Sequence, residues 1–220
     1  MRSIVFLFTV LFSIYARAQN QVDKIMEKAT CDCISKLLET QTQNENSFNA
    51  CCLKSIGRDT VLIKNECKRL HGDTTAETFY KFGSDFFKRN SVNLIYTCDT
   101  YFKMMDSIRY AQINSLNKDS VRASIASLNL TDSSTWDKDF LVARGLFYFA
   151  LADYKNAQKD LDASLAIDSN SVQAIFFKAW IFEIKKDYDS AIKLYAHVAT
   201  LTKKNDFNIF AAIAKRKKSS

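Results

Sequence analysis

Residues 138–167 read KDFLVARGLFYFALADYKNAQKDLDASLAI, and residues 172–201 read VQAIFFKAWIFEIKKDYDSAIKLYAHVATL. The second stretch repeats the residue types of the first at a spacing of 34. The matched pairs are Leu141 and Ile175, Gly145 and Ala179, Tyr148 and Phe182, Asp153 and Asp187, Tyr154 and Tyr188, Ala157 and Ala191, Leu161 and Tyr195, and Ile167 and Leu201. A period of this length is typical of stacked units that cannot bury their apolar faces alone.

Each unit predicts two helices joined by a tight turn. In the first unit, the 3.6-residue apolar period places these helices at about Trp136–Leu151 and Tyr154–Ile167. Gly145 and Ala157 would let the paired helices approach closely. Asp153 suits the N-cap of the second helix, because its side-chain oxygen can accept from free backbone N–H groups.

The pattern resembles the tetratricopeptide repeat. The resemblance rests on Leu141, Gly145, Tyr148, Tyr154, Ala157 and Leu161, and then on Ile175, Ala179, Phe182, Tyr188, Ala191 and Tyr195. There are two departures. Ser169 and Lys203 occupy the position where a proline usually closes a unit, and Arg144 and Lys178 replace a usual apolar residue.

Repeat arrays need about three units and a polar cap for stability. The segment from Asn205 to Lys215 is expected to supply a capping helix, with Phe207, Phe210 and Ile213 on one apolar face. A weaker correspondence precedes the repeats, because Ala111 and Ala123 lie 34 positions before Gly145 and Ala157. Asn114 and Ser127 break the rest of that match.

The resemblance implies a concave groove that binds a peptide and is lined by the first helix of each unit. Carried over to this chain, the partner-binding residues are Val142, Leu146, Phe149, Gln173, Phe176, Trp180, Glu183 and Ile184. Phe149, Phe176 and Trp180 would be the aromatic anchors for a hydrophobic peptide or amphipathic helix. The alternative is that the protein's own N-terminal helices cover this surface.

The N-terminus predicts export. Arg2 precedes an apolar run from Ile4 to Tyr15, and Ala16-Arg17-Ala18 provides a small-x-small cleavage site, so residues 1–18 are expected to be a signal peptide. The alternative is an uncleaved membrane anchor, for which the run is short. No comparable run follows, so the mature protein is expected to lack a transmembrane segment and to be periplasmic or extracellular.

All six cysteines lie within residues 19–116, a region expected to form a cross-linked helical domain. An even number of cysteines in an exported chain favours disulfides. Bridges are expected between the helix near Cys33 and the helix near Cys52, with Cys67 and Cys98 completing the set. The disulfide candidates are Cys31, Cys33, Cys51, Cys52, Cys67 and Cys98.

Composition favours an all-α fold, since the chain has no proline, only four glycines and no sustained alternation of apolar and polar residues. Gly72 is expected to end a helix, and Thr74-x-x-Glu77 resembles a capping box that opens the next one. Residues 117–135 are expected to be a linker in which Val121–Leu128 could form a short helix. Residues 136–220 would hold the two repeats, the capping helix and a frayed basic tail.

No motif in the sequence predicts catalysis. The two histidines, His71 and His197, are far apart, and neither a G-x-S-x-G motif nor a glycine-rich phosphate loop occurs. Without Arg2 and Arg17, 29 of the 31 basic residues remain against 24 acidic ones, a formal charge of +5. Part of this excess is the terminal cluster Lys215-Arg216-Lys217-Lys218, which in an exported protein favours anionic surfaces or partners over nucleic acid.

The sequence therefore predicts an exported, non-enzymatic protein-interaction module without cofactor or metal. Such a module could be an adaptor or assembly factor of the periplasm or cell envelope. The alternative is a thiol-redox or soft-metal protein that acts through the N-terminal cysteines.

Overall fold

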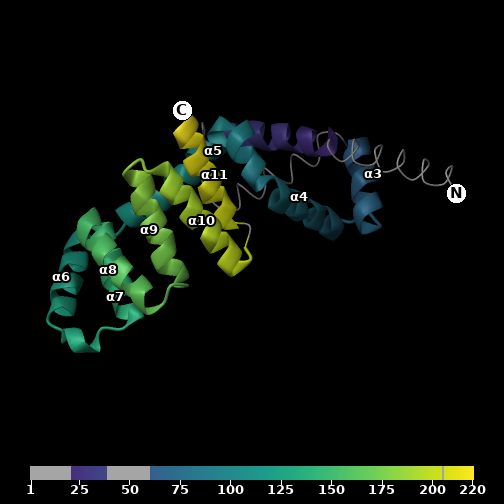
Figure 1. Ribbon diagram of the computed structural model, residues 1–220. Helices are drawn as coiled ribbons and strands as arrows, with labels where there is room; N and C mark the ends of the chain where they lie inside the picture. Colours follow the sequence, from purple (N-terminus) through teal and green to yellow (C-terminus); the bar gives the residue numbers. More distant parts are fainter. Residues whose placement is uncertain (1–20, 39–59, 205) are drawn as a thin grey trace. The chain divides into compact units, whose positions relative to one another are not determined.

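The computed structural model describes residues 21–38, 60–204 and 206–220, and their regular structure is helical, without strands (Figure 1). This confirms the all-α prediction. Residues 21–38 are helical. The remaining elements are α3 (Thr60–His71), α4 (Ala76–Thr97), α5 (Asp99–Asn114), α6 (Lys118–Asn129), a short 3-10 helix η1 (Ser133–Thr135), α7 (Lys138–Ala150), α8 (Tyr154–Ile167), α9 (Val172–Ile184), α10 (Tyr188–Thr202) and α11 (Asp206–Ser219).

The chain divides into two compact units, one ending at Phe102 and the other running from Lys103 to Ser220. The N-terminal unit has its own core, in which the helix at residues 21–38 packs against α3 and α4. The core residues are Val22, Met26, Ile63, Cys67, Phe82 and Phe86. Polar contacts at the edge join the same helices, because Asn93 donates to Glu27 at 2.6 Å and Arg89 to Asp23 at 3.5 Å.

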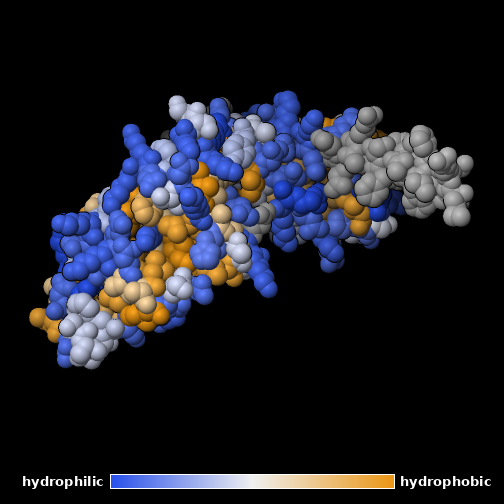
Figure 2. Space-filling model, in the orientation of Figure 1, coloured by the Kyte–Doolittle hydropathy of each residue, from blue (hydrophilic) through white to orange (hydrophobic). Residues whose placement is uncertain are grey.

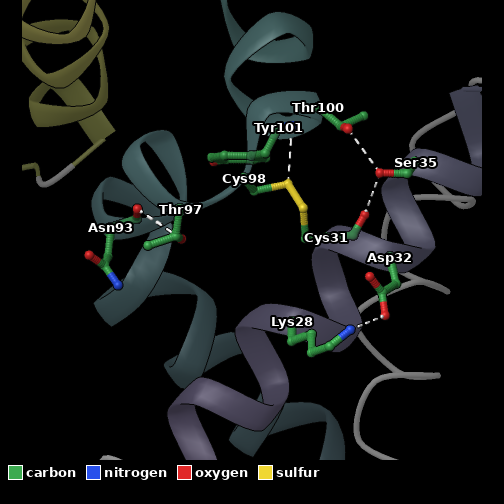
Figure 3. Close-up of a disulfide and its surroundings, with 9 residues drawn as sticks. All are labelled: Lys28, Cys31, Asp32, Ser35, Asn93, Thr97, Cys98, Thr100 and Tyr101. Atoms are coloured by element: carbon green, nitrogen blue, oxygen red, sulfur yellow. Dashed lines mark hydrogen bonds and ion pairs between the residues drawn. A yellow bond between two sulfur atoms is a disulfide. The ribbon is translucent and has the colours of Figure 1, made fainter.

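A disulfide joins Cys31 to Cys98, two residues separated by 67 positions (Figure 3). The Ser35 and Thr100 hydroxyls share a hydrogen bond of 2.8 Å beside it. A cross-link across a loop of this length stabilises a fold by about 4 kcal/mol on the chain-entropy model. It is compatible with an oxidising compartment.

The other cysteines fit the predicted set in part. Cys33 is also disulfide-bonded, and Cys51 and Cys52 lie outside the described residues. Cys67, in contrast, has a free thiol that is completely buried in the core of the N-terminal unit. It was expected to complete the set with Cys98, but Cys98 is already bonded to Cys31.

The predicted helix boundaries near Gly72 hold to within one residue. Gly72 follows the last residue of α3 with φ = 92°, a left-handed conformation that favours glycine. The cap of α4 is Thr75 and not Thr74, because the Thr75 side chain accepts from the backbone N–H of Thr78. Asp73 fixes this choice by accepting the Thr75 N–H at 3.0 Å.

In the C-terminal unit, α7 pairs with α8 and α9 with α10, which gives the two predicted helical hairpins. Asp153 and Asp187 cap α8 and α10, as expected, by accepting from Asn156 and Ser190. The helix expected to begin at Trp136 begins instead at Lys138, because Asp137 is its N-cap.

Residues 118–129 of the expected linker form α6, which packs on α7. Val121 and Ile125 of α6 form an apolar cluster with Ala150 of α7. Lys118 also donates to the backbone carbonyl of Ala150 at 2.5 Å. Much of this segment is therefore part of the helical array.

The expected capping helix is present as α11 and continues beyond Lys215 to Ser219. Its Ile213 is fully buried, while Phe207 and Phe210 are half-buried. The basic tail expected to fray is helical, since Lys217 bonds to Asp106 and Glu183, and Lys218 to Asp189.

Candidate functional site

The residues expected to line a peptide groove fall into two groups. Four are buried in the C-terminal unit, namely Val142, Phe149, Trp180 and Glu183. The other four are Leu146, Phe176 and Ile184, which are half-buried, and Gln173, which is exposed.

Helix α5 covers Trp180. The Tyr110 ring meets the Trp180 ring edge-on with centroids 5.3 Å apart, and the Arg109 guanidinium lies 4.9 Å from the Trp180 ring centroid. Phe149 packs against the other side of the same cluster, 4.8 Å from Trp180. Because α5 precedes the repeats, the protein's own chain occupies this part of the predicted groove.

Helix α11 covers part of Phe176. The rings of Phe210 and Phe207 lie 5.0 and 5.8 Å from the Phe176 ring. A peptide could reach the buried members of the predicted site only after α5 and α11 move. In this conformation the buried members of the predicted site contact only other parts of the same chain.

A buried ion network ties α5 and α11 to the second repeat. Arg109 donates to both Glu183 carboxylate oxygens, at 3.0 and 2.8 Å, and to the Tyr195 hydroxyl at 2.9 Å. Lys217 of α11 donates to the same carboxylate at 2.9 Å and to Asp106 at 2.7 Å. Glu183, which the repeat pattern places in the groove, is therefore buried with two internal cations as its partners.

The network shifts the titration of its members. Burial disfavours the charged form of Glu183, but the hydrogen bonds and charge of Arg109, with those of Lys217, outweigh it and hold the pKa of this carboxyl below its ordinary value. Burial and the adjacent Glu183 raise the pKa of Tyr195 well above its ordinary value. At neutral pH the network therefore contains an ionised Glu183 and a neutral tyrosine.

The accessible part of the predicted site is largely apolar. Figure 2 shows hydrophobic residues gathered over the part of the C-terminal unit where α9 lies. Leu146, Phe176 and Ile184 are half-buried and pack against the buried core of this unit. These side chains retain surface that a partner could contact without any rearrangement.

The basic residues that depart from the expected repeat pattern have internal partners. Arg144 donates to both oxygens of buried Asp160, each at 2.7 Å, and to Asn129 at 3.2 Å. Lys178 forms an ion pair with Asp162. Both pairs join the first helix of a repeat to α8, so these cations are held within the array.

Paired antiparallel helices stacked at a fixed period define the C-terminal unit as a helical-hairpin repeat domain. The profile of the tetratricopeptide repeat family matches residues 139–171, which span α7 and α8. The chain therefore contains a tetratricopeptide repeat in its C-terminal half, as the sequence pattern indicated. No curated protein and no solved structure matches the chain significantly.

The thiol and metal alternative gains no support from the described residues. They contain no group of three or more side chains that could hold a metal ion. Burial and the adjacent Asp73 raise the pKa of the Cys67 thiol, which disfavours the reactive thiolate.

Within the same described ranges, no helix combines the length and apolarity that crossing a bilayer requires. The expected signal peptide lies outside these ranges.

Sequence reasoning missed the residues that close the predicted groove, chiefly Arg109 and Tyr110 of α5. Their only signal was the weak correspondence that placed Ala111 and Ala123 one period before the first repeat. Lys217 was assigned to a solvated tail, because a run of four basic residues at a chain end gives no sign of a buried partner.

Proposed function

We propose that this protein is an exported, non-enzymatic protein-interaction module, an adaptor or assembly factor of the periplasm or cell envelope. The tetratricopeptide repeat supports a protein partner, because the family consists of protein-interaction scaffolds. The disulfide between Cys31 and Cys98 supports an oxidising compartment.

The proposed binding surface is the accessible part of the predicted groove. Leu146, Phe176 and Ile184 provide partly exposed apolar surface, and Gln173 provides an exposed amide at its edge. A hydrophobic peptide or an amphipathic helix would bury this surface with its own apolar side chains. The observation that supports this proposal most directly is the half-buried Phe176, an aromatic side chain of the type that anchors interfaces.

The test is site-specific photocrosslinking of the full-length protein in its native envelope. A photoreactive amino acid replaces Gln173 in one variant and Ala196 in the control. Both positions are exposed, but Ala196 lies on α10, outside the proposed surface. We expect a discrete crosslinked partner with the first variant only.

A second pair of variants tests whether the apolar contacts matter. Ile184→Ser should remove the crosslink formed at position 173, whereas Ile167→Ser, at an exposed position at the end of α8, should leave it unchanged. Circular dichroism of each variant checks that it is folded. Equal crosslinking at positions 173 and 196, or a product insensitive to Ile184→Ser, would exclude this surface.

A further inference from the structure

A cavity of about 420 Å³ lies on a different face of α7 from the predicted groove. Helix α7 contributes Arg144 and Tyr148, α8 contributes Lys159 and Asp160, and the segment between α6 and α7 contributes Ser133 and Trp136. All of these residues belong to the C-terminal unit. The volume falls within the range of small-molecule sites in proteins.

A buried ion pair lines the cavity. Arg144 and Asp160 are at least nine-tenths buried, and Arg144 holds both carboxylate oxygens of Asp160 with charge-assisted hydrogen bonds. The carboxylate of Asp160 is thereby neutralised and its geometry fixed. Arg144 uses three of its five N–H groups on Asp160 and Asn129, so two remain.

Trp136 forms an aromatic wall that is held in place from two directions. Its indole N–H donates to the backbone carbonyl of Thr131 at 3.2 Å, and the Arg144 guanidinium lies 3.9 Å from the ring centroid. Phe140 stacks on the same indole, with centroids 5.4 Å apart. A flat wall fixed in this way is preorganised to contact a planar ligand.

Three side-chain donors that line the cavity have no hydrogen-bond partner among the described residues. They are the Lys159 ammonium, the Tyr148 hydroxyl and the Ser133 hydroxyl. Lys159 also forms no ion pair there, in contrast to Lys138, which bonds to Asp168 at 2.6 Å. Since Arg144 and Asp160 cancel each other, Lys159 gives the cavity a formal charge of +1.

We propose that this cavity binds a small aromatic carboxylate. The carboxylate would accept from the Lys159 ammonium and from the free hydroxyls, and the ring would lie against Trp136 and Leu141. A cation does not fit, because the only carboxylate in the lining is already bound to Arg144. A purely apolar ligand fits less well, because it offers no acceptor to the half-buried Tyr148 hydroxyl or to the exposed Lys159 and Ser133 donors.

The second repeat does not reproduce this chemistry. Thirty-four positions after Trp136 and Asp160 lie Asn170 and Leu194, so neither the aromatic wall nor the buried carboxylate is repeated. Lys159 corresponds to Lys193, which is likewise exposed. Lys193 therefore offers a matched control for Lys159, with the same charge at the same position of the other repeat.

The test uses phenylacetate as the probe and phenylacetamide as its neutral analogue of the same shape. The chain has two tryptophans, so a nitrogen–proton correlation spectrum of the full-length protein shows two indole resonances, which Trp136→Phe assigns. We expect phenylacetate to shift the Trp136 resonance and to leave that of buried Trp180 in place. Phenylacetamide should bind at least about tenfold more weakly, because it lacks the charge-assisted contact.

Lys159→Gln should weaken phenylacetate binding by a similar factor, and Lys193→Gln should leave it unchanged. Both positions are exposed, so neither variant should affect folding. The proposal is overturned if phenylacetate leaves Trp136 unaffected, if phenylacetamide binds equally well, or if the two lysine variants behave alike.

Discussion

The two repeats have the same backbone plan, but they bury charge in different places. In the first, Arg144 of α7 pairs with Asp160 of α8, so the ion pair is contained within one hairpin. In the second, Glu183 of α9 pairs with Arg109 of α5 and Lys217 of α11, both outside the hairpin. Glu183 occupies the position of Phe149, one period later.

This difference separates a self-contained repeat from a dependent one. The first repeat can satisfy its buried charges with its own side chains. In the second repeat, only Arg109 of α5 and Lys217 of α11 neutralise the charge of the buried Glu183. This one carboxylate therefore couples the helix before the repeats to the helix after them. Tyr195, which occupies the position of Leu161, adds a hydroxyl to the same network through a 2.8 Å bond to Glu183.

The largest predicted effect is a loss of stability in the second repeat. Arg109→Met leaves Glu183 buried with only Lys217 as a charged partner, and breaking a buried pair costs about 3–5 kcal/mol of the free energy of unfolding. Urea denaturation followed by tryptophan fluorescence reports on this unit, because both tryptophans lie in it.

Arg144→Met is the matched variant in the first repeat. We expect a smaller loss, about 1–3 kcal/mol, because water in the adjacent cavity can reach the Asp160 carboxylate. If Arg144→Met proved as damaging as Arg109→Met, the contrast between a self-contained and a dependent repeat would fail.

An intermediate effect concerns pH. The folded-state pKa of Glu183 lies below its ordinary value despite burial, owing to Arg109 and Lys217. A carboxyl of this kind contributes stability above its unfolded pKa, near 4.3, and the contribution is lost as the pH falls through the folded value. The difference in unfolding free energy between wild type and Glu183→Gln should therefore be constant from pH 7 to about 5 and shrink below about pH 4.

Urea titrations of both proteins at half-unit pH intervals measure this difference. If the difference in unfolding free energy stays unchanged down to pH 3, the charge of Glu183 contributes nothing to stability and only its packing matters.

The smallest predicted effect compares the small residues Gly145 and Ala179, which occupy the same position of the two repeats. A methyl group added at Gly145 would lie 3.3 Å from the Leu161 side chain, so Gly145→Ala should change stability by less than about 1 kcal/mol, crowding offsetting the gain in helix propensity. Ala179→Gly, at the equivalent and fully buried position, should cost about 1–2 kcal/mol, because it loses both propensity and a buried methyl group. Thermal unfolding of the two variants checks the asymmetry, and equal shifts would show that the two contacts are interchangeable.

The fold was largely predictable because the repeat specifies it locally. The period of 34, the caps at Asp153 and Asp187 and the close contact at Gly145 are all short-range features of the sequence, and the structure contains each of them. The N-cap of α4 lies one residue beyond the predicted Thr74, where Asp73 accepts hydrogen bonds from both the backbone N–H and the hydroxyl of Thr75.

The candidate site was less predictable, because long-range contacts decide which face is open. Val142, Phe149 and Trp180 lie on the helix faces that the repeat pattern indicates, but nothing in that pattern shows that Tyr110 covers Trp180. The cavity at Trp136 was missed for a related reason. It depends on Trp136, expected as the first residue of a repeat helix, packing against Arg144, whose role the repeat pattern does not indicate.

The bond between Cys31 and Cys98 has a consequence for how this protein withstands proteases. The bond closes a covalent ring that contains every residue between the two cysteines. A single peptide cleavage anywhere in that ring opens it but cannot release a fragment, so the two halves stay attached until a reductant reaches the bond. A protease would need to cut the ring at least twice before it could release any residue that lies between the two cysteines.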